Sequence, residues 1–351
     1  MISASLSPNT EFDDVILAFK VLCMPWTWKQ GTAVSHVERR LGGLSFNSGR
    51  SALLSILKAF GVGRGSEVIV QAFTCVAVPN SVIWTGATPV YADIDDTYNI
   101  DPKDFEKKIT RRTKAVIVQH TFGIPAKIKE IIPIAKKHKI KVIEDFAHTM
   151  SLPLTGDAAF YSFGRDKVLS SVFGGLAVGV DVKKYHKTLE YPSNFWIFQQ
   201  LLHPIAFSII LPLYRVEIGK VILVILQRFG LLSLPQISEV KKYPNGLAVL
   251  LLNQLKKLPR YTKQREEIVK FYGGKGALLR YPMRVENPSS VVARAKKKGI
   301  LLGNWYHNVI DPSPVSYVVE SCPKAEEAAK HIINLPTRIS SNDAKRVLTA
   351  L

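Results

Sequence analysis

The stretch HKIKVIEDFAHTMSLPLTGDAAFYSFGRDK, residues 138–167, contains two apolar segments that each end in a group of polar side chains. The segments 140–146 and 158–163 are rich in Ile, Val, Ala and Phe, which predicts strands buried on both faces. In a parallel sheet, ligands bind at the carboxyl ends of the strands. The stretch therefore predicts the sheet and also the position of its site, at Asp145, His148, Ser162 and Lys167.

Further strands are predicted on both sides of this stretch, at 67–73, 88–94, 114–120 and 174–180. Helices are expected between them, at 51–61, from 79 to just before Gly86, and at 128–139. This alternation predicts an α/β fold with a mostly parallel central sheet flanked by helices. We assign residues 1–180 to this large domain, which is expected to hold the site.

The segment 181–240 breaks the alternation and is assigned to an apolar helical insert. From Tyr191 to Tyr214 it has 24 residues without Lys, Arg, Asp or Glu. A membrane-spanning helix needs about 20 predominantly apolar residues, and Pro204 and Pro212 are expected to interrupt this run. Three interpretations remain: a buried helical hairpin or dimer contact, a peripheral or re-entrant membrane contact through 191–235, and a spanning helix.

Residues 241–351 predict a smaller C-terminal α+β domain. Helices are expected at 246–258, at 261–272 and at 325–335, with short strands between them. Asn342 and Asp343 are expected to cap the last helix.

The composition favours a folded, cytoplasmic protein. Of 351 residues, 47 are Lys or Arg and 28 are Asp or Glu, which gives a formal net charge of +19. Such a charge favours anionic partners, but the basic runs are scattered and accompany no aromatic motif, so nucleic acid is not expected. Cys23, Cys75 and Cys322 form neither a metal pattern nor a disulfide framework. The N-terminus also lacks a signal-peptide pattern, and both features fit the cytosol.

Residues at two strand ends and one helix start fit a single cofactor. Pyridoxal 5'-phosphate needs a lysine for a Schiff base, a carboxylate facing the pyridine nitrogen and a phosphate cup at a helix N-terminus. Lys167 and Asp145 supply the first two, and Gly49 and Arg50 precede the helix at 51–61. Each feature alone also has a structural explanation, as a surface lysine, a capping network or an ordinary helix cap. The eight histidines show no HExxH motif, so no metal is expected.

These segments resemble the DegT/DnrJ/EryC1/StrS aminotransferases, fold-type I enzymes that use pyridoxal phosphate and act on nucleotide-linked keto sugars. The resemblance covers about residues 46–179 and 254 to the end, and leaves the insert out. The matching segments are SGRSAL (48–53), GSEVIV (65–70), GATPVYADID (86–95), ITRRTKAVIVQH (109–120), HKIKVIEDFAH (138–148), GDAAFYSFGRDK (156–167) and FGG (173–175).

The resemblance implies a role for each matching residue. It makes Lys167 the catalytic lysine that also binds the cofactor, and Asp145 the partner of the pyridinium nitrogen. His148 matches the His or Gln over the ring oxygen. Gly49 and Arg50 match the phosphate-binding turn, and Ser162 matches the phosphate-binding serine.

The sequence departs from the family pattern at four places. Arg50 replaces the usual Thr, and Cys75 stands where an aromatic residue commonly stacks on the cofactor, with Phe73 two residues away. The Asn-x-Arg pattern that reaches the other subunit's site is absent before Gln254, where Lys242 or Asn245 is the substitute to consider. Trp305-Tyr306 stands where x-His-Tyr is common.

The implied function is transfer of an amino group from an amino acid, glutamate being the expected donor, to a nucleotide-linked keto sugar. The product would serve cell-surface polysaccharide or related glycan biosynthesis, and the enzyme would be a homodimer. Lys167 argues against the dehydratases among similar proteins, in which histidine replaces this lysine. The alternative is a non-enzymatic or regulatory, membrane-associated protein that retains the fold.

Overall fold

The computed structural model describes residues 2–4, 8–232, 239–313 and 315–351. Its centre is a seven-stranded sheet in the order β2-β9-β8-β7-β6-β3-β5. The five strands from β8 to β5 are parallel, whereas β9 runs antiparallel to both β8 and β2. The predicted α/β fold with a mostly parallel sheet is confirmed. The strands are β2 (Gly43–Phe46), β3 (Glu67–Gln71), β5 (Thr88–Ala92), β6 (Thr113–Gln119), β7 (Lys141–Asp145), β8 (Ala158–Ser162) and β9 (Gly175–Val178).

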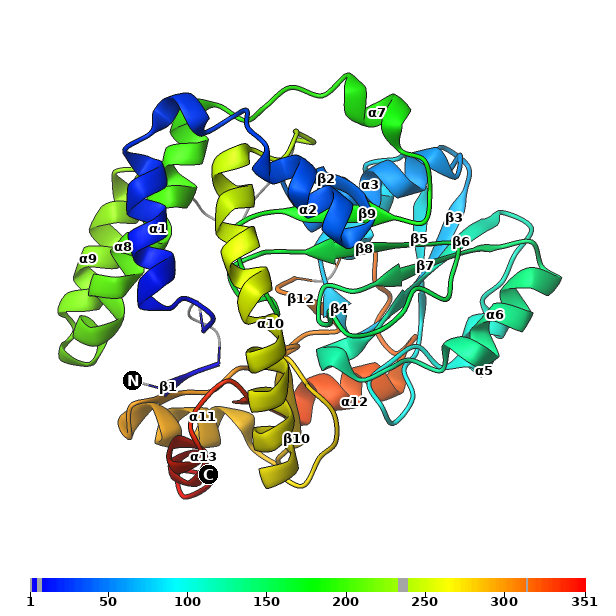
Figure 1. Cartoon of the computed structure of the whole chain (residues 1–351). Coiled ribbons are helices and arrows are strands. Elements are labelled where there is room, and N and C mark those ends of the chain that lie inside the picture. The colour runs from blue at the N-terminus through cyan, green and yellow to red at the C-terminus, as the bar shows by residue number, and fades with distance from the viewer. Residues whose placement is uncertain (1, 5–7, 233–238, 314) are drawn as a thin grey trace.

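Helices cover both faces of this sheet because its central strands are apolar on both sides. In β3, Val68 and Val70 pack in the core that also includes Ile56 of α3 (Gly49–Ala59). Ile69, between them, packs instead with Ile131 of α6 (Ile128–Lys137) on the other face. The helices α4 (Ala77–Ile83) and α5 (Pro102–Lys107) complete the two layers. Figure 1 shows the sheet between these helices.

The insert folds as a helical hairpin beside the sheet. It contains α7 (Lys183–Lys187), α8 (Asn194–Leu213), the short η3 (Tyr214–Val216) and α9 (Ile218–Arg228). The expectation that the two prolines interrupt the apolar run is wrong, because α8 continues through Pro204 and nearly to its end at Pro212. Packing explains this, since α8 lies against α1 (Phe12–Leu22) and α10 and buries Ile197, Leu201 and Ile210. Residues 233–235 of the predicted membrane contact lie outside the described residues.

Within the part of the chain that the structure describes, one helix, α8, is long and apolar enough to cross a membrane by length and composition. Of its most apolar 18 residues, 44% are buried inside the protein. Much of the apolar surface of α8 is therefore already covered by the rest of the chain.

A single long helix, α10 (Asn245–Phe271), follows the insert where we expected two helices. Pro259 lies inside α10 and does not end it, so the break expected between 258 and 261 is absent. The helix spans both parts of the molecule, as Figure 1 shows. Leu251 and Leu255 pack in the core shared with α1 and with α2 (Ala33–Leu41), whereas the C-terminal half adjoins α13 (Ser341–Leu348).

The C-terminal region contains short paired strands and helices. β10 (Arg280–Arg284) pairs with β13 (Ile332–Pro336), so the helix expected over 325–335 is wrong in its second half. That helix, α12 (Pro323–His331), gives way to β13 because Ile332, Ile333 and Leu335 are buried in the sheet pair. The last helix, α13, is capped by the Ser340 side chain, which accepts a hydrogen bond from the Asp343 N–H, and not by Asn342 and Asp343 as expected.

Two further strand pairs join segments that are far apart in the sequence. β1 (Ile2–Ser3) pairs with β11 (Ile300–Leu301), so the N-terminal residues lie against the C-terminal region, where α11 (Pro288–Lys297) also packs. β4 (Thr74–Cys75) pairs with β12 (Ile310–Asp311). The second pair brings the segment around Trp305 and Tyr306 to the edge of the sheet that holds the predicted site.

Candidate active site

One cavity of about 410 Å³ lies at the carboxyl ends of β7 and β8. Its walls come from the sheet, from α3, from the segment before β12 and from the insert. All seven predicted site residues line it, namely Gly49, Arg50, Cys75, Asp145, His148, Ser162 and Lys167. The structure thus brings together residues that are up to 118 positions apart in the sequence, from Gly49 to Lys167.

The N-terminus of α3 forms one end of this cavity. The Ser48 side chain caps the helix and accepts a hydrogen bond from the Ser51 N–H at 3.2 Å. A Cβ atom at Gly49 would lie 2.9 Å from Cβ of Ser162, and one at Gly175 would lie 2.3 Å from the Ser48 carbonyl oxygen. The glycines therefore allow β8 and β9 to approach the helix end closely. Backbone N–H groups and the positive end of the helix dipole suit a phosphate here.

Arg50 adds positive charge at the same end. It is half-buried in the first turn of α3, and burial lowers its pKa from the ordinary arginine value without removing its charge at neutral pH. A guanidinium group beside free helix N–H groups strengthens the preference for an anion.

Asp145 is the last residue of β7 and is almost fully buried. Its Oδ1 accepts a hydrogen bond from the Ala147 N–H at 2.8 Å. Burial raises the pKa of Asp145 to about 6, although the Ala147 hydrogen bond and the charges of Lys167 and His120 oppose the rise. Burial disfavours the ionised form of this carboxylate, so a cationic partner in the cavity, such as a protonated ring nitrogen, would stabilise it.

Lys167 lies in the loop after β8 and reaches into the cavity. Its Nζ lies 5.0 Å from the centre of the Trp305 ring. Burial lowers the pKa of Lys167, while Cys75 and Asp145 act in the opposite direction. A lowered pKa increases the fraction of Lys167 that is a neutral amine at a given pH, and the neutral amine is the nucleophilic and basic form.

His148 is held as a neutral ring beside the same tryptophan. The Phe122 N–H donates to its Nδ1 at 3.1 Å, and its Nε2 lies 3.3 Å from the Tyr306 hydroxyl group. Burial lowers the pKa of His148 well below its usual range, and the nearby charge of Lys167 contributes. The ring stacks on Trp305 at 5.4 Å between centroids. This arrangement makes His148 a flat, uncharged wall of the cavity.

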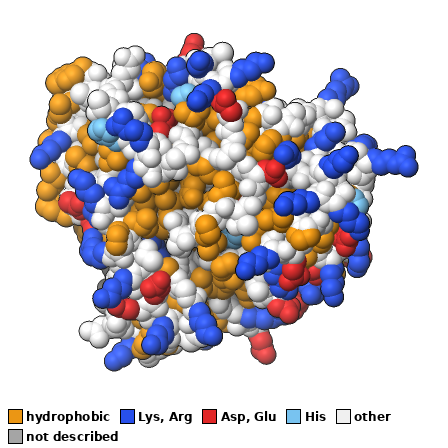
Figure 2. Space-filling view, turned by 45° about the vertical axis from the view of Figure 1, so that its right-hand side comes forward, with side chains coloured by type: hydrophobic (Ala, Val, Ile, Leu, Met, Phe, Trp, Pro, Cys, Tyr) orange, Lys and Arg blue, Asp and Glu red, His pale blue; other side chains and the backbone are white. Residues whose placement is uncertain are grey.

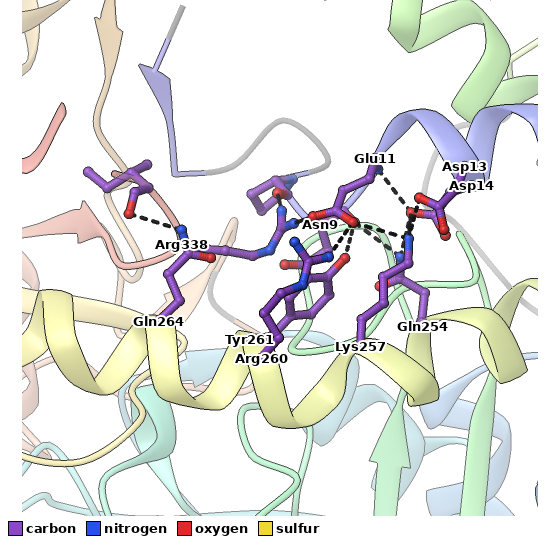
Figure 3. Close-up of polar contacts among 12 residues, drawn as sticks. Asn9, Glu11, Asp13, Asp14, Gln254, Lys257, Arg260, Tyr261, Gln264 and Arg338 are labelled. Atoms are coloured by element: carbon purple, nitrogen blue, oxygen red, sulfur yellow. Dashed lines mark hydrogen bonds and ion pairs between the residues drawn. The ribbon is translucent and has the colours of Figure 1, made fainter. Parts of the chain in front are cut away.

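The N-terminal segment fixes the backbone at Lys167, which the sequence did not indicate. Figure 3 shows Asn9 and the start of α1 against polar residues of α10. The Asn9 side chain donates to the carbonyl oxygens of Lys167 and, at 3.1 Å, Val168, and its own Oδ1 accepts from Arg265 at 3.0 Å. Gln254 donates to the Asn9 carbonyl oxygen and to Asp14. The buried network therefore positions the lysine through its backbone.

Cys75 and Phe73 occupy different environments. Cys75 is half-buried in β4 and lines the cavity, at the position where the resemblance implies a stacking aromatic. Phe73 is fully buried among Tyr98, Phe122 and Tyr306 and is not among the residues that line the cavity. Phe73 therefore does not substitute for the missing aromatic, whereas Trp305 and Tyr306 place aromatic rings at the cavity.

Glu144, which precedes Asp145, serves the fold. Its carboxylate lies 3.0 Å from Nε2 of His120 and accepts hydrogen bonds from the N–H groups of Thr155 and Gly156. These contacts lower its pKa against the effect of burial. Glu144 thus forms the capping network, and Asp145 alone of this pair faces the cavity.

Several residues that line the cavity were not identified from the sequence. Arg165 follows β8, and its Nη2 lies 3.4 Å from Oε1 of Gln200 in α8. The insert itself contributes His203 and Phe207 from α8 and Leu223 and Gln227 from α9. No motif marks these positions, because only the packing of the hairpin brings them to the sheet.

Lys242 and Asn245 are engaged within their own chain. The Asn245 side chain is buried, accepts from the Ala33 N–H at 3.0 Å and donates to the Thr27 carbonyl oxygen at 2.8 Å. Lys242 lies over the Tyr191 ring, 5.6 Å from its centre. Asn245 thus joins α10 to α2, which is a structural role.

The donor set of the cavity fits pyridoxal phosphate. A helix N-terminus with Ser162 and Arg50 suits the phosphate, Asp145 suits the ring nitrogen, and Lys167 lies within the same space. Among the described residues there is no group of three or more His, Cys, Asp or Glu side chains that could hold a metal ion.

Comparison with known proteins places these features in a family. Residues 31–194 match the model of the DegT/DnrJ/EryC1/StrS aminotransferase family. The chain is 25% identical to GDP-perosamine synthase from Escherichia coli O157:H7 over an alignment 330 residues long, which covers 89% of this chain and 84% of that protein. It is also 27% identical to a pleiotropic regulatory protein from Geobacillus stearothermophilus, over an alignment 361 residues long with its gaps, which covers 92% of this chain and 87% of the other.

The fold is shared with solved structures over nearly its whole length. The aminotransferase TlmJ from Streptoalloteichus hindustanus superposes with a TM-score of 0.74 at 20% identity, covering 100% of this chain and 97% of TlmJ. At this identity the likeness concerns the fold, and the site depends on the residues described above.

Proposed function

Because the chain belongs to the DegT/DnrJ/EryC1/StrS aminotransferase family, we propose that it is a pyridoxal-phosphate-dependent sugar aminotransferase. The single observation that carries this proposal is the meeting of Lys167, Asp145 and the α3 N-terminus in one cavity. Any one of these features occurs in proteins without a cofactor. Together they match the three chemically distinct parts of pyridoxal phosphate.

The residues of the site divide the work among them. Bound pyridoxal phosphate supplies an electron sink for breaking the C–H bond beside the transferred nitrogen. Lys167 is the group that takes this proton and returns it, because its amine lies in the cavity and burial lowers its pKa. Asp145 would keep the ring nitrogen protonated, and Ser162, Gly49 and Arg50 would hold the phosphate. His148 keeps water from one face of the site.

The proposed substrates are an amino-acid donor, glutamate, and a nucleotide-linked keto sugar. Relatives named for GDP-, UDP- and dTDP-linked sugars support the second substrate class. A relative named for spore coat polysaccharide biosynthesis supports a role in cell-surface glycans.

The test combines a labelling experiment with a substrate screen. Purified protein with pyridoxal phosphate is reduced with borohydride and digested, and the pyridoxyl group is expected on the peptide that contains Lys167. The protein is then incubated with glutamate and a panel of GDP-, UDP- and dTDP-linked keto sugars, and the aminated sugar is sought by mass spectrometry. Label on another lysine, or none, contradicts the proposal.

A second candidate function is regulation without catalysis, and the relative named as a pleiotropic regulatory protein supports it. A regulatory protein with this fold would bind the cofactor or a sugar nucleotide without turning over. Labelled Lys167 together with no amination of any sugar in the panel would favour this alternative over the enzyme.

We also propose that the protein is a cytoplasmic homodimer that touches a membrane surface through α9. The outward face of α9 exposes Ile218, Val221, Val224, Ile225 and Phe229, and Lys220 and Arg228 lie on the same helix. On the face in Figure 2, hydrophobic side chains gather at the left edge and also over the centre, and Lys and Arg side chains are dispersed among them. An apolar face with flanking cations suits the surface of an anionic bilayer.

Flotation with liposomes tests the membrane contact, and light scattering tests the dimer. The double variant Val221→Ser/Val224→Ser should lose flotation with anionic vesicles while the transaminase rate stays unchanged. Its stability should change by no more than about 0.5 kcal/mol, because both side chains are exposed. A wild-type protein that never floats would remove the membrane contact and leave the α9 face for a second copy of the chain.

A further inference from the structure

Two arginines from different parts of the chain line the cavity. Arg50 belongs to the first turn of α3, and Arg165 follows β8 by three residues. Burial lowers the pKa of both guanidinium groups, that of Arg165 to about 10, so both remain charged at neutral pH. A phosphate dianion is best compensated by more than one charged donor, and arginine suits it because of its fork geometry.

Two contacts hold the Arg165 side chain at the cavity. Its Nη2 lies 3.4 Å from Oε1 of Gln200, and its Cζ lies 5.2 Å from the centre of the Phe173 ring. Phe173 immediately precedes the Gly174-Gly175 segment, where a Cβ at Gly175 would lie 2.5 Å from the Gly49 backbone nitrogen. The ring under Arg165 is therefore attached to the strand that touches the end of α3.

Gln200 connects this arrangement to the insert. It lies in α8, is fully buried and also donates to the Trp196 carbonyl oxygen at 3.0 Å. Its amide therefore has a fixed orientation, with the oxygen toward Arg165. His203, one turn further along α8, also lines the cavity and is kept neutral, since burial and the charge of Arg165 lower its pKa.

Asn245, one of the two residues considered for contact with a partner subunit's site, is already engaged within its own chain. Asn245 is buried with hydrogen bonds to α2 and to the segment before it, as described above. Arg165 lies in the same cavity as Ser162 and Gly49, so a further charged contact for a phosphate is available within one chain.

We propose that Arg165, positioned by Gln200 of α8, is the second arginine of the phosphate cup, so that the insert completes the cofactor site within one chain. This inference rests on the proposed function, because it assigns the phosphate of pyridoxal phosphate as the anion. It gives the insert a role in cofactor retention that is separate from any membrane contact.

The test compares two ligands that differ only in the phosphate. Dissociation constants of pyridoxal 5'-phosphate and of pyridoxal are measured by absorbance for the full-length wild type, Arg165→Gln and Arg165→Lys. Loss of one charged contact should weaken binding of the phosphorylated ligand about 10- to 100-fold and leave pyridoxal within about twofold. Arg165→Lys, which keeps the charge, should recover part of the loss. Arg228→Gln in α9 is the matched control and should match the wild type.

Two further variants separate this role from others. Gln200→Leu should weaken binding of the phosphorylated ligand about 3- to 10-fold, again without an effect on pyridoxal. Mixed oligomers of Arg165→Gln with Lys167→Ala chains should not recover tight binding, because the intact Arg165 and the intact Lys167 then belong to different chains. Recovery in the mixture would overturn the single-chain cup.

The outcomes distinguish failure of this inference from failure of the proposed function. If the wild type binds neither ligand, the proposed function fails. If Arg165→Gln weakens both ligands equally, Arg165 maintains the shape of the cavity, and the inference is wrong. If it leaves both affinities unchanged and raises KM for the nucleotide sugar, Arg165 binds the substrate instead, and the inference is again wrong.

Discussion

The two walls of the cavity differ in how their residues are held. The sheet wall consists of Asp145 and Ser162 at strand ends and of the capped N-terminus of α3, so the main chain itself sets their positions. The insert wall consists of side chains from α8 and α9, two helices held mainly by apolar contacts with each other and, for α8, with α1 and α10. The sheet wall carries the reactive groups, whereas the insert wall shapes the space around them.

The difference between the two walls indicates how a substitution in each should affect activity and stability. A side chain at a strand end acts through its own chemistry, so its replacement removes a function while the strand persists. A side chain in the hairpin acts through packing, so its replacement changes stability and fit together. The following experiments test this contrast.

Replacement of Lys167 should give the largest effect. Lys167→Ala removes the group that moves the proton, and we expect transamination to fall by at least about four orders of magnitude. The melting temperature should change little, because the side chain points into the cavity and does not pack in the core. Stopped assays of aminated sugar check the rate, and calorimetry checks the fold. A residual rate above a hundredth of the wild type would contradict the role of Lys167.

Asp145→Asn should separate activity from stability. Loss of the carboxylate should lower kcat about 100- to 1000-fold, since the ring nitrogen loses its anionic partner. In the cofactor-free protein the same substitution should increase the free energy of unfolding. The reason is that the pKa of Asp145 in the native state, about 6, exceeds the ordinary aspartate value of 3.8, so its ionised form is disfavoured by folding. In the wild type, stability should therefore fall as pH rises from about 4 to 6, as the buried carboxylate ionises.

The variant lacks this ionisation. Above pH 6 it should exceed the wild type in free energy of unfolding by about 1 to 3 kcal/mol, and below pH 4 the two should converge. Urea unfolding at pH 4, 6 and 8 measures the difference. A variant that is less stable than the wild type at pH 8 would show that the carboxylate has a structural partner.

Asn9→Ala should disturb the position of the Lys167 backbone, which Asn9 holds through a hydrogen bond outside the cavity. The change leaves buried Arg265 without its contact to Oδ1 of Asn9 and frees the carbonyl oxygens of Lys167 and Val168. We expect a loss of about 2 to 4 kcal/mol in the free energy of unfolding, because a buried charge loses a partner. Ser208→Ala, on the exposed side of α8, is a control with a surface hydrogen bond and should change stability by less than about 0.5 kcal/mol. Equal losses in the two variants would contradict the network.

Phe207→Leu should give the smallest effect and probes the insert wall. Phe207 packs against His203 with 4.1 Å between ring centroids and lines the cavity. We expect a loss of about 1 kcal/mol in stability and a several-fold rise in KM for the sugar substrate, with kcat nearly unchanged. Ile209→Ala, on the exposed side of the same helix, should leave KM unchanged. A fall in kcat without a change in KM would place Phe207 in the chemistry.

Much of the sheet could be predicted because local pattern and tertiary environment agree there. The apolar runs at 67–73, 114–120 and 140–146 are buried on both faces, so each predicts a strand of a parallel sheet without further information. The helix and strand at 325–335 could not be separated, because KHIINLP continues an apolar pattern that a helix and a strand both accept. Pairing with β10 decides that boundary.

The candidate site divides along the same line. Asp145, Ser162 and Lys167 could be found because the first two end a strand and Lys167 lies in the loop that follows one, and strand ends meet at one edge of a parallel sheet. Asn9 and Phe207 could not be found. Each reaches its place through contacts across more than 150 positions or through the docking of a whole hairpin, and no local motif encodes either.

The sequence by itself indicated most of the central strands with several of the helices between them, the resemblance to the family and the candidate residues for the chemistry. Hydrophobic periodicity and polar residues at strand ends are local properties of the sequence, and the preference for helix or strand that they indicate depends on neighbouring residues alone. Only the tertiary structure decided that α8 and α10 run unbroken through their prolines, that Asn245 is used within its own chain and that the insert forms a wall of the cavity. These outcomes depend on packing between distant segments, whose free energy exceeds the local preferences that the sequence displays.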